Sequence, residues 1–183
     1  MRIFGIDPGS QRTGYGCVER TGRGQALVIC GSLSGPKGAT FPDRLLAIHE
    51  GLKALIARHQ PDCVAIEDIF HHRNVRSALK LGQARGIALL AASEAGLPVV
   101  SYAPAAVKQA VVGYGRAEKQ QVQQMVKLLL GLDSVPTPHD AADALAVAIC
   151  HVHSAPARAA GAAAAAPTGS KATTWRSYRP ARS

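Results

Sequence analysis

The sequence predicts an α/β protein whose mixed sheet of five strands is flanked by helices on both faces. Three strand-like segments come first, and helices alternate with strands in the rest of the chain, an order typical of layered α/β folds. Of the 183 residues, 47% are hydrophobic and 18% are charged. A chain of this length and composition can bury the core of one globular domain without disulfides or a structural metal.

The first three predicted strands form an antiparallel meander. Residues 3–6 are an apolar run closed by Asp-Pro-Gly-Ser, so we expect a buried central strand that ends in a turn. Residues 13–19 and 26–33 are strand-like, and the Thr-Gly-Arg-Gly segment between them is typical of a hairpin turn. These strands would make up one half of the sheet.

The rest of the domain alternates helices with short strands. Leu45, Ile48, Leu52 and Ile56 recur at helical spacing, and Pro61 follows them as a stop signal. The predicted elements are a helix at 42–59, a strand at 63–67, a long small-residue helix at 74–95, a strand at 98–100, a flexible Gly-Tyr-Gly loop at 113–115 and helices at 117–130 and 138–153. Elements in this order complete a mixed sheet and cover it.

Charge is unevenly distributed along the chain. Residues 1–154 hold 16 basic residues against all 12 acidic ones, a net charge of +4, whereas five more basic residues follow residue 154. The segment 155–183 is rich in alanine and proline and lacks apolar periodicity, so we expect a domain at 1–154 and a basic, disordered tail after it. The formal charge of +9 favours a polyanionic partner such as nucleic acid.

Neither a membrane segment nor a secretion signal is predicted. No run of about 18 apolar residues occurs, and Asp7 interrupts the apolar stretch that a signal peptide would need. The four cysteines stand singly, without the Cys-x-x-Cys spacing of a metal site or redox motif. We therefore expect a cytoplasmic protein with buried, reduced thiols and no membrane partner.

Two acidic residues stand where predicted strands end. Asp7 follows the first strand, and Glu67 closes the strand at 63–67. In open α/β sheets, ligands bind beyond the carboxyl ends of strands, so these two carboxylates are candidates for one shared site. Each also has a structural alternative, because Asp before Pro-Gly is common in turns and a Glu after a strand is commonly solvated.

The last predicted helix adds two more carboxylates. Asp140 and Asp143 are three residues apart, so their side chains share one helical face. A capping box with Thr137 as N-cap, Pro138 at the first position and Asp140 at the third would explain Asp140 without any chemistry. It explains Asp143 poorly, because that residue lies beyond the first turn among small alanines.

Four converging carboxylates would require cations or protons. Two like charges about 4 Å apart repel by roughly 4 kcal/mol at an effective dielectric constant near 20, and a cluster of four contains several such pairs. Oxygen ligands without His or Cys favour Mg²⁺ or Mn²⁺ over zinc. Two such ions about 3.5–4 Å apart suit in-line displacement at phosphorus.

Five stretches of the chain form an ordered pattern. They are GIDPGSQRTGYG at 5–16, VAIEDIF at 64–70, SALKLGQARG at 77–86, VKQAVVGYGRAEKQQV at 107–122 and DAADALAVA at 140–148. Together they resemble the RuvC family of Holliday junction resolvases over nearly all of residues 1–154. The resemblance implies a ribonuclease-H-like fold, a homodimer, a RuvA–RuvB branch-migration partner and Mg²⁺-dependent nicking of two opposed strands of four-way DNA junctions.

The resemblance also implies the catalytic residues. By position, the metal-binding acids of the family fall on Asp7, Glu67, Asp140 and Asp143. They are expected to hold two Mg²⁺ ions per subunit, with Mn²⁺ as an alternative, and Asp7 is expected to bridge both ions.

DNA contacts are expected from an aromatic and three basic residues. The family places an aromatic residue at the position of Phe70, to stack on an unpaired base near the junction centre, with core packing as its alternative. Lys108, Arg116 and Lys119 flank the 113–115 loop and are candidates for neutralising phosphates. The roles of His71, His72 and His139 stay open.

The long helix at 74–95 has two interior glycines. Each of Gly82 and Gly86 costs about 1 kcal/mol relative to alanine in a helix, so a close approach by another element is expected to compensate. A dimer contact or the face of the sheet would provide that approach.

Three rival functions remain at this point. A nuclease of the same fold that acts on RNA shares the GIDxG opening, but the DAADAL and KLGQARG stretches fit it less well. An actin-like ATPase or sugar kinase resembles the segment from Asp7 to Gly16, yet that fold needs two such domains and about twice this length. The third rival is a non-catalytic junction-binding module, against which the presence of all four acids argues.

Overall fold

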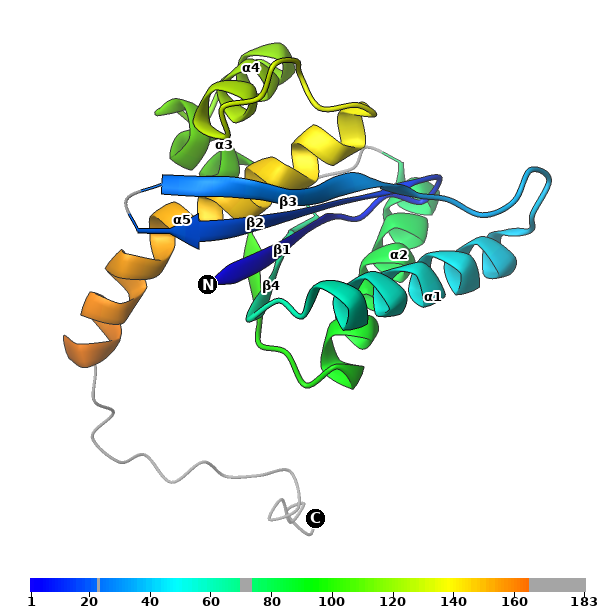
Figure 1. Cartoon of the computed structure of the whole chain (residues 1–183). Helices are drawn as coiled ribbons and strands as arrows, with labels where there is room; N and C mark the ends of the chain where they lie inside the picture. Colours follow the sequence, from blue (N-terminus) through cyan, green and yellow to red (C-terminus); the bar gives the residue numbers. More distant parts are fainter. Residues whose placement is uncertain (23, 70–73, 165–183) are drawn as a thin grey trace, which may run out of the picture.

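The computed structural model describes residues 1–22, 24–69 and 74–164, and its centre is a mixed sheet of five strands (Figure 1). The strands are β1 (Arg2–Asp7), β2 (Thr13–Thr21), β3 (Gly24–Leu33), β4 (Cys63–Glu67) and β5 (Val99–Tyr102), in the spatial order β3-β2-β1-β4-β5. The β1, β2 and β3 strands are antiparallel neighbours, whereas β4 runs parallel to β1 and β5 parallel to β4. The predicted α/β fold class is confirmed.

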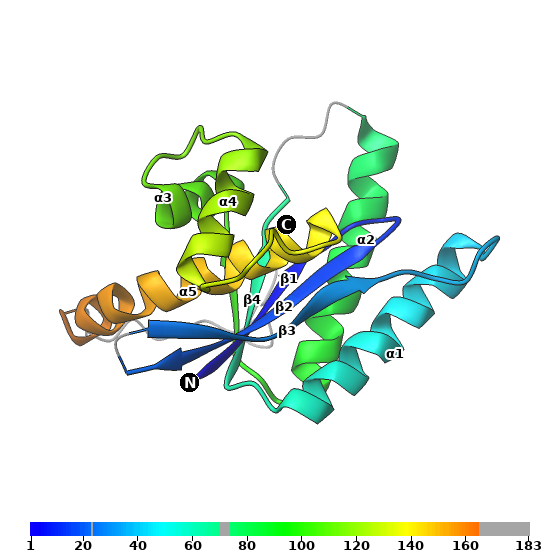
Figure 2. The same cartoon turned by 45° about the horizontal axis from the view of Figure 1, so that its top comes forward.

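Helices cover both faces of this sheet. They are α1 (Phe41–His59), α2 (Val75–Glu94), α3 (Pro104–Val112), α4 (Lys119–Leu129) and α5 (His139–Ala164). The α1 and α2 helices lie on one face, while α5 crosses the other and is covered in turn by α3 and α4 (Figures 1 and 2). Of the helices that the structure describes, none combines the length and the hydropathy required to span a bilayer.

Two helices differ from the prediction. The sequence predicts no helix at α3, although Pro104 stands at its start and Gly113, with a φ of 98°, ends it in the left-handed conformation. Val107 and Val111 of α3 are buried against the α5 side of the core. The α5 helix continues beyond the predicted end at 153 to Ala164, and the domain boundary near 154 stays a prediction.

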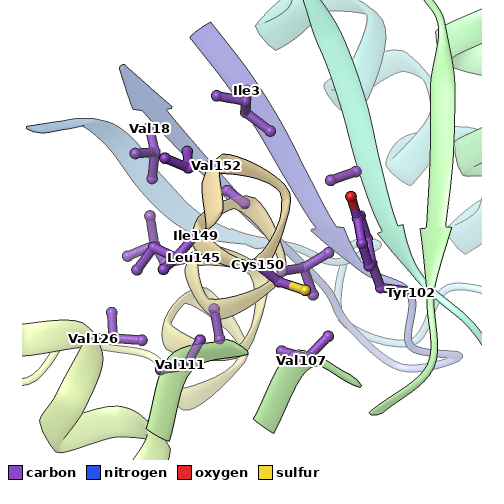
Figure 3. Packing of buried hydrophobic residues seen from close by; sticks show 14 of the residues in the cluster. Ile3, Val18, Tyr102, Val107, Val111, Val126, Leu145, Ile149, Cys150 and Val152 are labelled. Carbon is purple, nitrogen blue, oxygen red and sulfur yellow. The ribbon is translucent and has the colours of Figure 1, made fainter. Parts of the chain in front are cut away.

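The sheet separates two apolar layers because strand side chains alternate between its faces. Ile3 of β1 packs with Leu145 and Ile149 of α5 in one layer (Figure 3). Phe4 and Ile6 of the same strand point the other way, into a second layer. Partners of that second layer include Ile48 and Leu52 of α1, Val64 and Ile66 of β4, and Ala88 and Ala91 of α2. Each fully buried Val, Leu, Ile or Phe side chain contributes about 1.5–3 kcal/mol.

Glycines let the α5 helix lie directly on β1 and β2. A Cβ atom at Gly5 would overlap the backbone oxygen of Ala144, and one at Gly14 would overlap that of Asp140. At Gly16 it would lie 2.7 Å from the side chain of Leu145. The first turns of α5 are therefore held against the end of the β1–β2 pair, which brings the acids of α5 to the sheet edge where β1 ends.

Candidate active site

Asp7 and Glu67 lie side by side because their strands are parallel neighbours in register. Ile6 of β1 pairs with Ile66 of β4, and the two acids are the next residues. Gly5 and Ala65 face α5, so the acids two residues later face the same side. The two carboxyl groups are joined by a side-chain hydrogen bond. The structure thus places the two strand-exit acids side by side.

The α5 helix adds its two carboxylates to this pair. One carboxylate oxygen from each of Asp7, Asp140 and Asp143 lies within 4.8 Å of the others. Glu67 is outside that group of three but reaches it through Asp7. The capping-box alternative for Asp140 is wrong, because α5 begins at His139 and puts Asp140 in its second position. The fold thus brings Asp7, Asp140 and Asp143 together, with Glu67 beside Asp7.

Burial and mutual repulsion raise the pKa values of the two strand acids. The pKa of Asp7 is raised to about 8, first by desolvation and then by the charges of Glu67 and Asp143. The pKa of Glu67 is raised mainly by burial, although its hydrogen bond with Asp7 acts in the opposite direction. Without a cation the cluster therefore retains a proton. Its donors are carboxylate oxygens with no thiol or imidazole, which fits a hard divalent cation such as Mg²⁺.

Three of the acids, Asp7, Glu67 and Asp143, line a cavity of about 300 Å³ that is also lined by two lysines. Lys119, at the start of α4, forms an ion pair with Asp143 at 2.5 Å, and Lys108 of α3 also lines the cavity. Partial burial lowers the pKa of Lys119, but the hydrogen bond and charge of Asp143 outweigh that effect and raise it overall. The cavity thus combines carboxylates that could bind metal ions with lysines that could bind a phosphate group of DNA.

Apolar residues that the sequence reading did not single out form the remaining walls. Pro104 and Val107 of α3, Val122 of α4 and Ala146 of α5 line the cavity beside the charged groups. The helical spacing of Val107 and Val111 after Pro104 was the available signal for α3.

The other DNA-binding candidates are placed differently. Arg116 is exposed in the connection between α3 and α4 and does not line the cavity. Phe70 lies outside the described residues, as do His71 and His72. His139 is exposed, and its Nδ1 lies 3.1 Å from the side-chain nitrogen of Gln123.

Comparisons with known proteins agree with this geometry. A family model described as crossover junction endodeoxyribonuclease RuvC matches residues 3–151. The protein of that name from Chloroflexus aggregans is 56% identical over 156 residues, which are 85% of this chain and 95% of the relative. Its counterpart from Trichlorobacter lovleyi is 54% identical over 180 residues, which are 98% of this chain and 100% of the relative. T. thermophilus RuvC in complex with a Holliday junction substrate matches with a TM-score of 0.81 and 38% identity, over 86% of this chain and 96% of that one.

The matched region contains β1, β4 and the first turns of α5, which carry the four carboxylates. The mixed five-stranded sheet also agrees with the ribonuclease-H-like fold that the sequence resemblance implied. The similarity supports a junction nuclease over an ATPase or sugar kinase. Fold, site and sequence therefore lead to one conclusion, that the chain belongs to the RuvC family of crossover junction endodeoxyribonucleases.

Proposed function

We propose that this protein resolves four-way DNA junctions by metal-dependent phosphodiester hydrolysis at the Asp7–Glu67–Asp140–Asp143 cluster. The observation that carries the proposal is the convergence of acids from β1, β4 and α5 beside two lysines in one cavity. Two Mg²⁺ ions per subunit, or Mn²⁺ in their place, would activate a water for attack on phosphorus and stabilise the departing 3′ oxygen.

The acids of the chain would share the work of holding the ions. Asp7 lies beside Glu67, and its carboxylate is within 4.8 Å of those of Asp140 and Asp143, so it would be a ligand common to both ions. Glu67 would complete one coordination shell, and Asp140 and Asp143 the other. Asp143 would hold a cation in place of its ion pair with Lys119, and the lysine would then be available to a DNA phosphate.

A nicking assay with mapped cut positions tests the proposed function. The purified protein is incubated with four-way, flapped and linear DNA and with a four-way RNA junction, with and without Mg²⁺. We expect paired nicks at symmetric positions in the four-way DNA alone, and only with the metal. Binding without cutting would indicate a non-catalytic module, and faster cutting of RNA would indicate the related RNA nuclease.

Lys119→Ala is expected to reduce cleavage by about a hundredfold, because a cation aimed at the reacting phosphate is lost. Junction binding should weaken for all sequences alike, and the slope of log affinity against log salt should fall by about one. Single-turnover cleavage and salt-titrated binding measure the two effects. Lys127→Ala, on the same helix but outside the cavity, is the matched control. Equal losses in both variants would contradict a specific role for Lys119.

We also propose that two copies of the chain pair through α2. One side of this helix is buried on the sheet by Ala84, Ala88 and Ala91. The opposite side has a stripe at helical spacing, formed by Val75, Leu79, Gly82, Gly86 and Leu90, which we call the α2 stripe; its residues are exposed except for the half-buried Gly82. A Cβ atom at Gly86 would have no neighbour within 4 Å, so the sheet does not account for the glycines. A second copy would, and a twofold axis would present two sites to opposed DNA strands.

Leu79→Glu is expected to weaken dimerisation by at least about a hundredfold, because it would bury an unpaired charge in the α2 stripe. Leu79 is 65% exposed in the single chain, so the fold itself should persist. Analytical ultracentrifugation measures the effect. Leu128→Glu on α4, at a residue that is 69% exposed, is the control and should leave the dimer intact. A dimer that tolerates Leu79→Glu would rule out pairing through α2.

The cellular setting follows from the same proposal. A junction in chromosomal DNA would place the protein in the bacterial cytosol. The family resemblance makes the RuvA–RuvB branch-migration complex the expected partner, and we assign no surface of the described residues to it.

A further inference from the structure

A second hollow lies beside the catalytic cavity, and the mechanism above does not use it. It is a groove of about 550 Å³ lined by Gln120, Gln121, Gln123, Gln124, Val135 and His139, which we call the glutamine groove. Among these residues there is no acid, lysine or arginine. The groove therefore offers neutral hydrogen-bonding groups on an apolar floor, in contrast to the charged cavity next to it.

The two hollows have no lining residue in common, but both are built on α4 and α5. Lys119 lines the catalytic cavity and Gln120, the next residue of α4, lines the glutamine groove. On α5, His139 lines the groove and is followed directly by Asp140 of the acid cluster. The Lys119–Asp143 ion pair ties these two helix starts together. The groove is therefore within one residue of the cavity on α4 and of the acid cluster on α5, close enough for a nucleotide next to the cut phosphate to reach it.

Two of the four glutamine side chains form hydrogen bonds within the protein. The side-chain oxygen of Gln121 accepts hydrogen bonds from the hydroxyl of Tyr114 and the backbone N–H of Glu118. The amide nitrogen of Gln123, a residue only 6% exposed, donates to Nδ1 of His139. These bonds fix the wall and orient the imidazole, which, when neutral, carries its proton on Nε2.

The other two glutamines are exposed. Gln120 and Gln124 are four residues apart on α4, so their side chains lie one above the other on one face of the helix. A carboxamide has both donors and an acceptor, and glutamine can pair with two atoms of a base edge at once. Phosphates are instead bound chiefly by cations, helix N-termini and backbone N–H groups. The chemistry of the groove therefore suits a base better than a phosphate.

We propose that the glutamine groove receives a base next to the scissile phosphate, and that Gln120 and Gln124 contribute to the sequence preference of cleavage. This inference rests on the proposed function and deepens it, because it assigns a nucleotide subsite to residues outside the metal-binding cluster. In it, Gln123 positions His139, and Gln120 and Gln124 contact the base edge.

The test compares cleavage rates over four-way junctions that differ only in the two bases on each side of the mapped cut. In the wild-type protein we expect a clear ratio between the best and the worst sequence. The double variant Gln120→Ala/Gln124→Ala should reduce this ratio by at least about fivefold, the smallest discrimination expected from one paired amide–base contact. Its Mg²⁺ dependence should not change. Leu128→Ala, an exposed position on the same helix outside the groove, should keep the full ratio.

The cleavage experiment separates an incorrect base subsite from an incorrect nuclease function. A wild-type protein that cuts no four-way junction would overturn the proposed function. If the wild type discriminates and the double variant does so equally well, the groove is not a base subsite, although the nuclease assignment stands. Cutting of all sequences at one rate, or an equal loss in Leu128→Ala, would overturn the inference too.

Discussion

Asp7→Asn is expected to slow junction cleavage by at least about a thousandfold and to leave junction binding nearly unchanged. Asp7 is the acid in contact with both Glu67 and the α5 carboxylates, so its loss removes a ligand common to both proposed ions. Stabilisation of charge by such ions is worth several kcal/mol, and each 1.4 kcal/mol is a factor of about ten in rate. Binding should persist because it depends mainly on cations such as Lys108.

The fold should survive this substitution. Asparagine has the shape of aspartate and is neutral at every pH, whereas Asp7 must keep a proton to be neutral, because burial and the charges of Glu67 and Asp143 raise its pKa to about 8. We therefore expect a Tm at or above that of the wild type when no metal is present. Single-turnover cleavage, gel-shift binding and thermal unfolding measure the three properties. A variant that loses binding, cleavage and thermal stability together would show that Asp7 is structural.

Asp133→Asn is the matched control for this experiment. Asp133 is an exposed acid between α4 and α5 and does not line the catalytic cavity. The same chemical change at this position should leave cleavage within about twofold of the wild type, as is usual for surface substitutions. An equal loss at Asp133 would point to a general effect of charge on DNA binding and not to metal ligation.

The positions of Asp7 and Glu67 were predictable because the apolar pattern of a short segment largely determines where a strand lies and where it ends. A buried apolar run that ends in an acid places that acid at the sheet edge, and two parallel neighbours place their acids together. Asp7 and Glu67 meet this description. Asp140 and Asp143 were predictable as a pair from their helical spacing, but their distance from Asp7 was not.

That distance depends on contacts between segments far apart in the sequence. The approach of α5 to the sheet is set by Gly5 and Gly14, whose missing side chains leave room for the α5 backbone. In sequence these glycines look like ordinary turn or strand residues. The α3 helix was missed for a related reason, because its nine residues are stabilised by burial of Val107 and Val111 and not by strong local propensity.

For Lys108 and Lys119 too, the sequence indicates a shared neighbourhood, but only the tertiary packing determines which side chains reach the cavity. Sequence placed both on either side of a glycine-containing loop, together with Arg116. Only the packing of α3 and α4 on α5 decides that the two lysines line the cavity, whereas Arg116 is exposed outside it. Proximity along the chain is therefore weak evidence for a shared site when a helix end intervenes.

Gly14→Ala is expected to lower the free energy of unfolding by about 3 kcal/mol, the upper part of the usual range for overpacking. The added methyl group would overlap the backbone oxygen of Asp140, and a backbone atom in a helix cannot rotate away as a side chain can. The start of α5 must then move off β2 and take Asp140 and Asp143 away from Asp7. We expect cleavage to fall by more than the loss of folded protein explains, which activity measured well below the Tm can separate from unfolding.

Gly24→Ala is the control for this last substitution, because it adds the same methyl group in the neighbouring strand. A Cβ atom there would have no neighbour closer than 3.9 Å, so stability and cleavage should stay near those of the wild type. If Gly14→Ala instead folds with normal stability and cuts at the normal rate, then α5 does not need its close contact with β2. The acid cluster would in that case be held by the cations it binds, and the glycines on β1 and β2 would have no part in building the site.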